Sequence, residues 1–92
     1  MTYRIRWLRG ALRDLNAHAA WLKQFPQAKP TETINLIRAT AIRLALLGDV
    51  GRPDGGGGRR TILVSGRPYR LVYRVAGDAI EIIAVFHTAQ DR

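Results

Sequence analysis

The chain has 92 residues, of which 47% are hydrophobic and 24% are charged. This composition favours one folded domain with a modest core over a disordered chain. No segment approaches the roughly 18 continuous apolar residues of a membrane span, and the N-terminus lacks the apolar core of a signal peptide, so we expect cytoplasmic residence. The chain has no cysteine. Disulfides and thiolate metal sites are therefore excluded, and we expect no metal and no cofactor.

The charge is strongly basic. Lys and Arg number 15 against 7 Asp and Glu, which gives a net charge of +8, and only Lys23 and Lys29 are lysines. Guanidinium groups suit bidentate contacts with carboxylates or phosphates. The balance favours an acidic protein segment or a nucleic acid as partner. The alternative is a merely solvated surface rich in arginine.

The N-terminal half predicts a short strand and two helices. Residues 2–7 alternate apolar side chains with arginines, as a strand with one buried face does. Apolar residues at helical spacing predict a first helix from about residue 9 to residue 25, ended by Pro26. Thr31 is a candidate N-cap for a second helix that runs to about Leu47 and stops at Gly48. The short connector predicts an antiparallel helical hairpin over about 9–47.

The apolar stripes predict which helical side chains are buried. On the first helix the stripe holds Leu8, Leu12, Leu15, Ala19 and Leu22, and on the second it holds Ile34, Ile37, Ala41 and Leu44. We also expect both tryptophans, Trp7 and Trp21, in the core. His18 lies inside the first helix and is expected to be a boundary residue without a functional role.

Residues 48–58 form a glycine-rich loop in which Gly51-Arg52-Pro53-Asp54 precedes four consecutive glycines. A phosphate-binding P-loop would need Gly-Lys-Ser/Thr at the start of a helix. Here Arg59 and Arg60 begin a strand instead. The segment therefore predicts a flexible loop and not a nucleotide site.

The C-terminal segment, residues 59–87, predicts a β-meander of three strands. They cover about 59–64, 69–75 and 79–86, with turn residues at 65–68 and 76–78. The expected fold is an α+β domain of order β-α-α-β-β-β. In it the helical hairpin packs on one face of a small, mostly antiparallel sheet, and the first strand lies at an edge or beside the last.

The strand over 69–75 places arginines on the sheet face that the helices leave uncovered. Its aromatic and aliphatic residues, Tyr69, Leu71, Tyr73 and Val75, share one face, and its arginines share the other. We expect the uncovered face to carry Arg70, Val72, Arg74, Ile83 and Val85. A mixed basic and apolar face of this kind indicates a partner. The alternative is that Arg70 and Arg74 pair with Glu81 across the strands.

The chain contains, in this order, the segments Tyr3-x-Ile5-x-Trp7, Ala11-Leu12-Arg13-Asp14-Leu15, Gly51-Arg52-Pro53, Val64 to Val75, and Ile80 to His87. As an ordered set they resemble the RelE/ParE superfamily of bacterial type II toxins. The resemblance covers most of the chain. It implies a single toxin-like domain and a cognate antitoxin whose acidic C-terminal segment wraps the toxin. The residues expected to bind the antitoxin or the target are Arg67, Arg70, Val72, Arg74, Ile83, Val85 and His87.

The superfamily resemblance implies one of two targets. RelE-like members are ribosome-dependent mRNA endonucleases, whereas ParE-like members act on DNA gyrase and need not be enzymes. If this chain were a nuclease, its candidate catalytic residues would be Arg60, Arg70 and His87, because RNA cleavage needs a proton acceptor, a cation and an acid. His87 could equally be a structural residue at the end of its strand.

The departures from the nuclease pattern favour the ParE-like interpretation. The strand over 59–64 lacks the lysines that RelE-like nucleases carry there, and no tyrosine follows Tyr73. A gyrase inhibitor neutralised by an antitoxin is therefore the leading hypothesis. An mRNA endonuclease is the second, and a non-toxic relic that only binds an antitoxin is the third.

Overall fold

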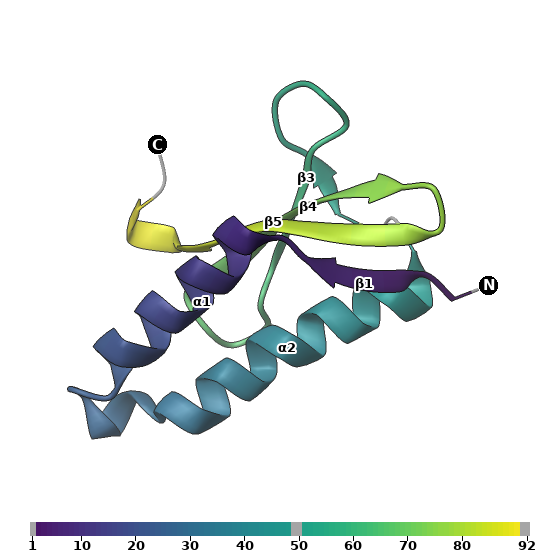
Figure 1. The fold of residues 1–92 in the computed structure, drawn as a ribbon. Coiled ribbons are helices and arrows are strands. Elements are labelled where there is room, and N and C mark those ends of the chain that lie inside the picture. Colours follow the sequence, from purple (N-terminus) through teal and green to yellow (C-terminus); the bar gives the residue numbers. More distant parts are fainter. Residues whose placement is uncertain (1, 49–50, 91–92) are drawn as a thin grey trace.

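The computed structural model describes residues 2–48 and 51–90 (Figure 1). The elements are β1 (Arg4–Trp7), α1 (Arg9–Leu22), a 3-10 turn η1 (Pro26–Ala28), α2 (Pro30–Leu47), β2 (Arg52–Pro53), β3 (Arg60–Leu63), β4 (Tyr69–Ala76), β5 (Ala79–His87) and a 3-10 turn η2 (Thr88–Gln90). Residues 49–50 of the predicted loop, and 91–92 of the tail, lie outside the described residues. Within the described part of the chain, no helix is long and apolar enough to cross a membrane.

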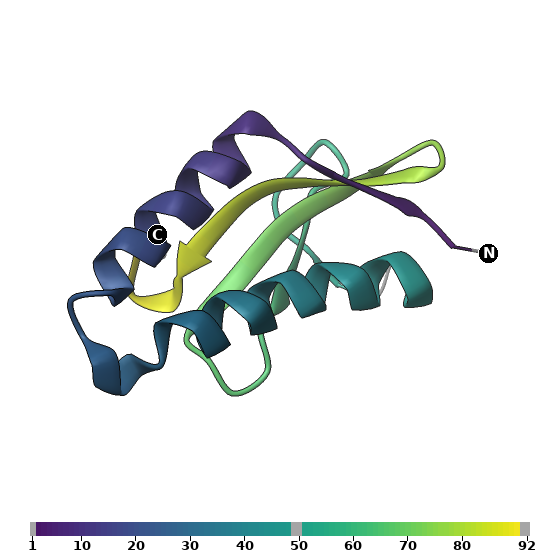
Figure 2. The ribbon, with the colours of Figure 1, turned by 60° about the horizontal axis from the view of Figure 1, so that its bottom comes forward.

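The predicted α+β fold is confirmed. The sheet has the order β1-β5-β4-β3-β2, in which β1 runs parallel to β5 and the other neighbours are antiparallel. The first strand is therefore both at an edge and beside the last. The two-residue strand β2 was not predicted, because Arg52 and Pro53 are too few to show a period. Both helices lie on one side of the sheet, α1 on β5 and α2 across β1, β4 and β5 (Figure 2).

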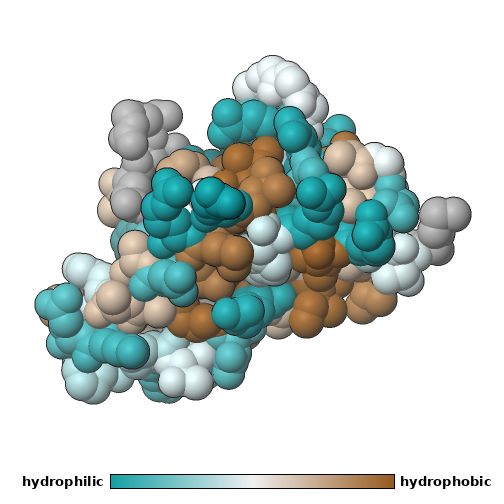
Figure 3. Space-filling model, viewed as in Figure 1, coloured by the Kyte–Doolittle hydropathy of each residue, from teal (hydrophilic) through white to brown (hydrophobic). Residues whose placement is uncertain are grey.

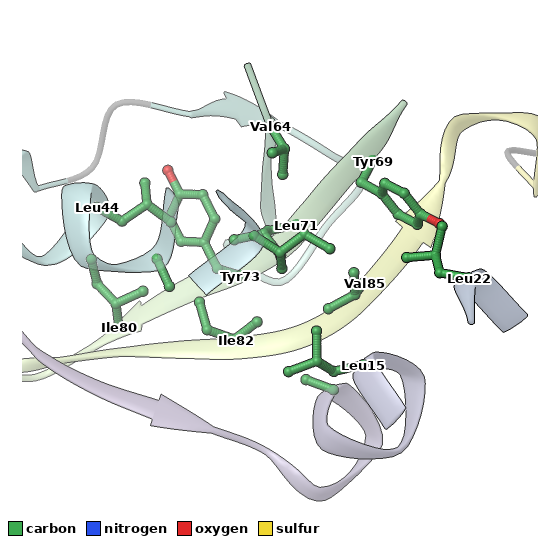
Figure 4. Close-up of a cluster of buried hydrophobic side chains, with 13 residues drawn as sticks. Leu15, Leu22, Leu44, Val64, Tyr69, Leu71, Tyr73, Ile80, Ile82 and Val85 are labelled. Carbon is green, nitrogen blue, oxygen red and sulfur yellow. The ribbon is translucent and has the colours of Figure 1, made fainter. Parts of the chain in front are cut away.

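The core lies between the helices and the inner face of the sheet. Figure 4 shows side chains from α1 and α2 meeting side chains from β4 and β5, among them Leu15, Leu22, Leu44, Tyr69, Leu71, Tyr73, Ile80, Ile82 and Val85. The aromatic and aliphatic face predicted for the strand over 69–75 points into this core. Its last member, Val75, reaches the end of the sheet and is 36% exposed.

On α1 the residues that face the sheet lie on a different side of the helix from the predicted apolar stripe. The residues facing the sheet are Ala11, Leu15, His18 and Leu22, whereas Leu12 is 44% exposed and Trp21 is 50% exposed. The prediction of Trp21 as a core residue is therefore wrong. Ala11 has a small side chain and is completely buried, so α1 approaches β5 along the Ala11 side. Leu12 and Trp21 are left outside as a result.

A β-bulge changes which residues of β5 face the helices. Val72 pairs with Ala84 but the next residue, Tyr73, pairs with Ile82, so Ile83 is an extra residue without an opposite partner. After the bulge the alternation is reversed. Val85, predicted on the uncovered face, is consequently a core residue with 1% exposure.

The second helix begins differently from the prediction but ends as predicted. Its N-cap is Lys29, in the left-handed region at φ 52°, and Pro30 occupies the first helical position. Thr31 is therefore not the cap. Thr33 is buried and its hydroxyl donates to the carbonyl of Ala28 at 2.9 Å. At the other end Gly48 has φ 84° and donates its N–H to Leu44, which confirms the predicted stop.

Candidate functional site

The outer face of the sheet carries a row of charges across three strands. Glu81 on β5 is only 7% exposed, and it lies opposite Arg6 of β1 and Arg74 of β4. Arg74 Nε donates to its carboxylate at 2.8 Å, and an Arg6 nitrogen lies 3.5 Å away. The alternative that Arg74 pairs with Glu81 is confirmed. Glu81 thus neutralises one of the two positive charges on this part of the face.

Arg70 is held on the same face by other groups and does not pair with Glu81. Its guanidinium lies 5.3 Å from the centre of the Phe86 ring, in cation–π geometry. One nitrogen donates to the Thr61 hydroxyl at 3.3 Å and lies 3.9 Å from a carboxylate oxygen of Asp54. The side chain is 15% exposed, so most of the Arg70 side chain is covered by its own protein.

The predicted binding residues do not form one continuous exposed surface. Val72 and Val85 are buried, at 0% and 1% exposure. Ile83 is half-buried at the bulge, whereas Arg67 and His87 line a groove at the end of the sheet next to α1. Arg70 and Arg74 are therefore the members of the predicted set whose charged groups lie on the outer face.

Every described carboxylate has a partner inside the protein. Glu32, Asp54, Asp78 and Glu81 each pair with arginine, and Asp14 accepts the backbone N–H of Val85 at 3.0 Å. Eight exposed cations, in contrast, have no ion pair with any described residue. They are Arg9, Arg13, Lys23, Lys29, Arg38, Arg43, Arg52 and Arg59. The surplus charge thus lies on the helices, their connector and the glycine-rich hairpin.

A groove lies between the C-terminal end of α1, η1 and the end of β5. It consists of two cavities of about 430 and 420 Å³, both lined by Trp21, Tyr69 and His87. Lys29 and Arg67 line the first cavity, and no described acidic residue lines either one. Arg67 is fixed by the Thr33 hydroxyl at 3.0 Å and by Glu32 at 3.4 Å. The groove is therefore apolar with a cationic end.

Aromatic rings form the wall of this groove. The Trp21 ring lies 4.7 Å from Phe25 and 6.5 Å from His87, and Tyr69 lies edge-on between His18 at 5.0 Å and His87 at 5.1 Å. The sequence pattern does not predict this groove, because it places Trp21 in the core. The available signal was that Trp21 lies off the apolar stripe of α1.

Tyr69 is unusual within this wall. Its hydroxyl is buried next to Leu22 (Figure 4) and finds no hydrogen-bond partner among the described residues. Burial raises the pKa of Tyr69 above its ordinary value. The neighbouring His18 is partly buried, as expected of a boundary residue. Its Nε2 lies 2.9 Å from the Val85 carbonyl, which can only accept, so Nε2 carries the proton.

The three candidate nuclease residues lie apart. Arg70 is on the outer face of the sheet, whereas Arg60 and His87 belong to the inner side, opposite Tyr73 and Tyr69 respectively. Those two tyrosines are four residues apart on β4, about 13 Å at the rise of a strand. Arg60 donates to the Gly51 carbonyl at 3.0 Å, and the Nδ1 of His87 accepts the N–H of Ala89 at 3.0 Å. The structure does not bring the three together.

Comparison with known proteins identifies the family. The model of the ParE toxin of the type II toxin–antitoxin system parDE matches residues 5–92. No curated protein sequence matches significantly.

Solved structures share the fold at low sequence identity. The chromosomal ParDE toxin–antitoxin system of P. aeruginosa is similar with a TM-score of 0.79 and 24% identity, over 94% of this chain and 96% of that one. The RelBE2 complex of Mycobacterium tuberculosis gives 0.68 and 23%, over 95% and 92%. A mutant of the E. coli toxin RelE in the free state gives 0.58 and 17%, over 99% and 88%. Because the family model spans nearly the whole chain, this protein belongs to the ParE toxin family of type II toxin–antitoxin systems.

Proposed function

We propose that this protein is a toxin that inhibits DNA gyrase by binding to it, and that a cognate antitoxin with an acidic segment neutralises it. The observation that carries the choice of a binding inhibitor is the separation of Arg60, Arg70 and His87. General acid–base cleavage of RNA requires its groups within hydrogen-bond reach of one phosphate. Here one candidate lies on the opposite face of the sheet from the other two.

A supercoiling assay tests the target. Purified toxin added to DNA gyrase at micromolar concentration is expected to block the supercoiling of relaxed plasmid. In parallel, translating ribosomes with a defined message should show no toxin-dependent cleavage. Uninhibited gyrase together with message cleavage that Arg70→Ala abolishes would replace this proposal with the endonuclease. Uninhibited gyrase, intact message and normal growth of cells expressing the toxin would favour the non-toxic relic.

The antitoxin contact has support from the groove and from the helices. Trp21 presents half its surface beside Lys29 and Arg67, and no described acid lines the cavities. Ile42, Leu46 and Leu47 of α2 are also more than half exposed. An acidic segment with apolar side chains gains both burial and charge pairing there. The predicted contact through Arg70, Arg74 and Ile83 on the outer sheet face stays a second prediction.

Trp21→Ser tests the antitoxin contact. The partner used in the test is the product of the reading frame next to the toxin gene, if it encodes a short acidic protein, and binding is measured by calorimetry. A buried interface tryptophan commonly contributes about 2 kcal/mol or more, so affinity should fall by roughly 30-fold. Leu12→Ser is the matched control, because Leu12 is 44% exposed on α1 and lines neither cavity of the groove. Equal losses in the two variants would refute the groove as the antitoxin site.

A further inference from the structure

The β2–β3 hairpin has a tip of four consecutive glycines, a feature that no other exposed part of the described chain has. Arg52 pairs with Thr61 and Pro53 with Arg60, and the N–H of Asp54 donates to the Arg59 carbonyl at 2.9 Å. The four residues at the tip are all glycine. The tip therefore projects backbone without side chains (Figure 1), and Figure 3 shows it as pale atoms at the top of the molecule above hydrophilic side chains.

The legs of this hairpin carry unpaired positive charge. Arg52 and Arg59 are exposed, and neither forms an ion pair with a described residue. The hairpin's acid, Asp54, lies 3.9 Å from Arg70. At the base, Arg52 and Arg70 line a cavity of about 350 Å³ together with Thr61, Thr88 and the apolar Ile62 and Leu63 of β3. Guanidinium groups thus lie at the base of the hairpin, on Arg52 and Arg70, and next to its glycine tip, on Arg59.

We propose that the β2–β3 hairpin, residues 51–60, contacts the phosphate backbone of duplex DNA. A protein partner is disfavoured because protein interfaces depend on buried aromatic or aliphatic anchors, and the tip offers none. Phosphate contacts need only arginine forks and accessible backbone N–H groups, which this hairpin provides. The exposed apolar side chains of α1 and α2 lie elsewhere, so protein and nucleic acid would meet different parts of the surface.

Duplex is favoured over single strands for a related reason. Proteins that hold single-stranded nucleic acid stack its bases on aromatic side chains. The hairpin has no aromatic residue. Trp21, the most exposed aromatic side chain among the described residues, is on α1. The choice of DNA over duplex RNA rests on the proposed function, because gyrase acts on duplex DNA.

Variants that replace the hairpin's arginines by neutral glutamine test the proposal without gyrase. Binding of the purified toxin to a short labelled DNA duplex is followed by fluorescence anisotropy between about 50 and 200 mM NaCl. The double variant R52Q/R59Q should bind about tenfold more weakly, and its salt slope should fall by about one for each arginine removed. The control R38Q/R43Q removes the same charge from exposed, unpaired positions on α2 and should change affinity less than threefold.

A second variant probes the tip itself. Gly56 has open space around its Cα, so Gly56→Asp introduces a carboxylate without a steric clash. It should weaken DNA binding, whereas Asn35→Asp on α2, with the same change of charge, should not. Equal losses in hairpin and helix variants would show that binding follows net charge alone and overturn the proposal. Preference for a single-stranded RNA of equal length would overturn it in favour of RNA.

The two proposals fail separately. Loss of DNA binding in R52Q/R59Q with no effect of the toxin on gyrase would keep the hairpin contact and remove the proposed target. Inhibition of gyrase by R52Q/R59Q at wild-type strength, with no binding of the DNA duplex by the wild type, would do the reverse.

Discussion

Two tyrosines on one strand show how much a single hydroxyl depends on its surroundings. Tyr69 and Tyr73 are both buried on the inner face of β4. The Tyr73 hydroxyl accepts the N–H of Gly51 at 2.6 Å, whereas the Tyr69 hydroxyl has no hydrogen-bond partner among the described residues. Gly51 permits this approach because a Cβ there would lie 2.5 Å from the Tyr73 hydroxyl. We therefore expect the tyrosine hydroxyl to stabilise the fold at position 73 but not at position 69.

Replacing each tyrosine by phenylalanine is expected to give opposite results. Tyr73→Phe removes the acceptor of a partly buried N–H and should lower the free energy of unfolding by about 1–2 kcal/mol. Tyr69→Phe removes a buried hydroxyl without a partner, so stability should stay constant or rise by up to about 1 kcal/mol. Urea unfolding followed by circular dichroism measures both. Equal destabilisation would mean that the Tyr69 hydroxyl has a partner in solution.

Tyr69 also predicts part of the alkaline response. Because burial raises its pKa above the ordinary value, the unfolded chain loses this proton at a lower pH than the folded chain. The part of the free energy of unfolding that comes from this pKa difference is fully present below about pH 10, the pKa of tyrosine in the unfolded chain. It decreases as the pH rises from there towards the folded pKa. Unfolding measured between pH 9 and pH 11, values chosen around that ordinary pKa, should show a steeper decline in wild type than in Tyr69→Phe. Identical declines would contradict the assignment.

At the scale of elements, the row Arg6–Glu81–Arg74 joins three strands on the outer face. Removing a cation from a largely buried carboxylate costs more free energy than removing one from an exposed carboxylate, because water cannot replace it. The molecule contains a natural comparison, since Arg4 and Asp78 form an exposed pair at 3.2 Å with side-chain exposures of 68% and 71%. The two pairs differ mainly in their access to water.

Removing one arginine from each pair should separate their contributions. Arg74→Ala leaves Glu81 with Arg6 alone and is expected to cost about 1–2 kcal/mol of unfolding free energy, because the carboxylate stays desolvated. Arg4→Ala should cost less than about 0.5 kcal/mol. Thermal and urea unfolding at low salt provide the measurement. A cost for Arg4→Ala as large as that for Arg74→Ala would rule out burial as the reason.

Strands and helix ends are predictable from the sequence where they depend on neighbouring residues. Which face a side chain occupies is predicted wrongly where it depends on residues distant in the sequence. The turn residues and alternation of 69–75 predict β4, and Gly48 predicts the end of α2, because each depends on neighbouring residues. Val85 was placed on the wrong face because the extra residue Ile83 is visible only in the pairing of two strands. Trp21 was placed in the core because Ala11, a weak apolar signal, is the residue along which α1 approaches the sheet. The sequence does not show this rotation of α1 about its axis, which leaves Trp21 outside the core to line the groove.

At the scale of the whole molecule, charge is unevenly distributed. The described acids are all engaged, while eight exposed cations have no ion pair with a described residue. Like charges on a folded surface repel one another and destabilise the folded state. An acidic antitoxin would relieve this repulsion, and so would screening ions.

Salt should therefore stabilise the isolated toxin. Raising NaCl from about 10 to 100 mM shortens the screening length from about 30 to 10 Å. The thermal midpoint should rise by a few degrees, because repulsion among the exposed cations is reduced more than the short ion pairs are weakened. The variant R38Q/R43Q should show a smaller rise. A midpoint that falls with salt would mean that the internal ion pairs outweigh the repulsion.

The parallel pairing of β1 with β5 has a consequence for how the protein is made. Strand β5 lies between β1 and β4, so the strand that comes last in the sequence occupies an interior position in the sheet. Until Ala79–His87 leaves the ribosome, β1 has no strand to pair with and the helices have no complete surface to cover. Pairing of β1 therefore waits for the last strand of the domain, and contacts that span most of the chain make folding slow. A newly made toxin should pass through an interval in which it is present but inactive.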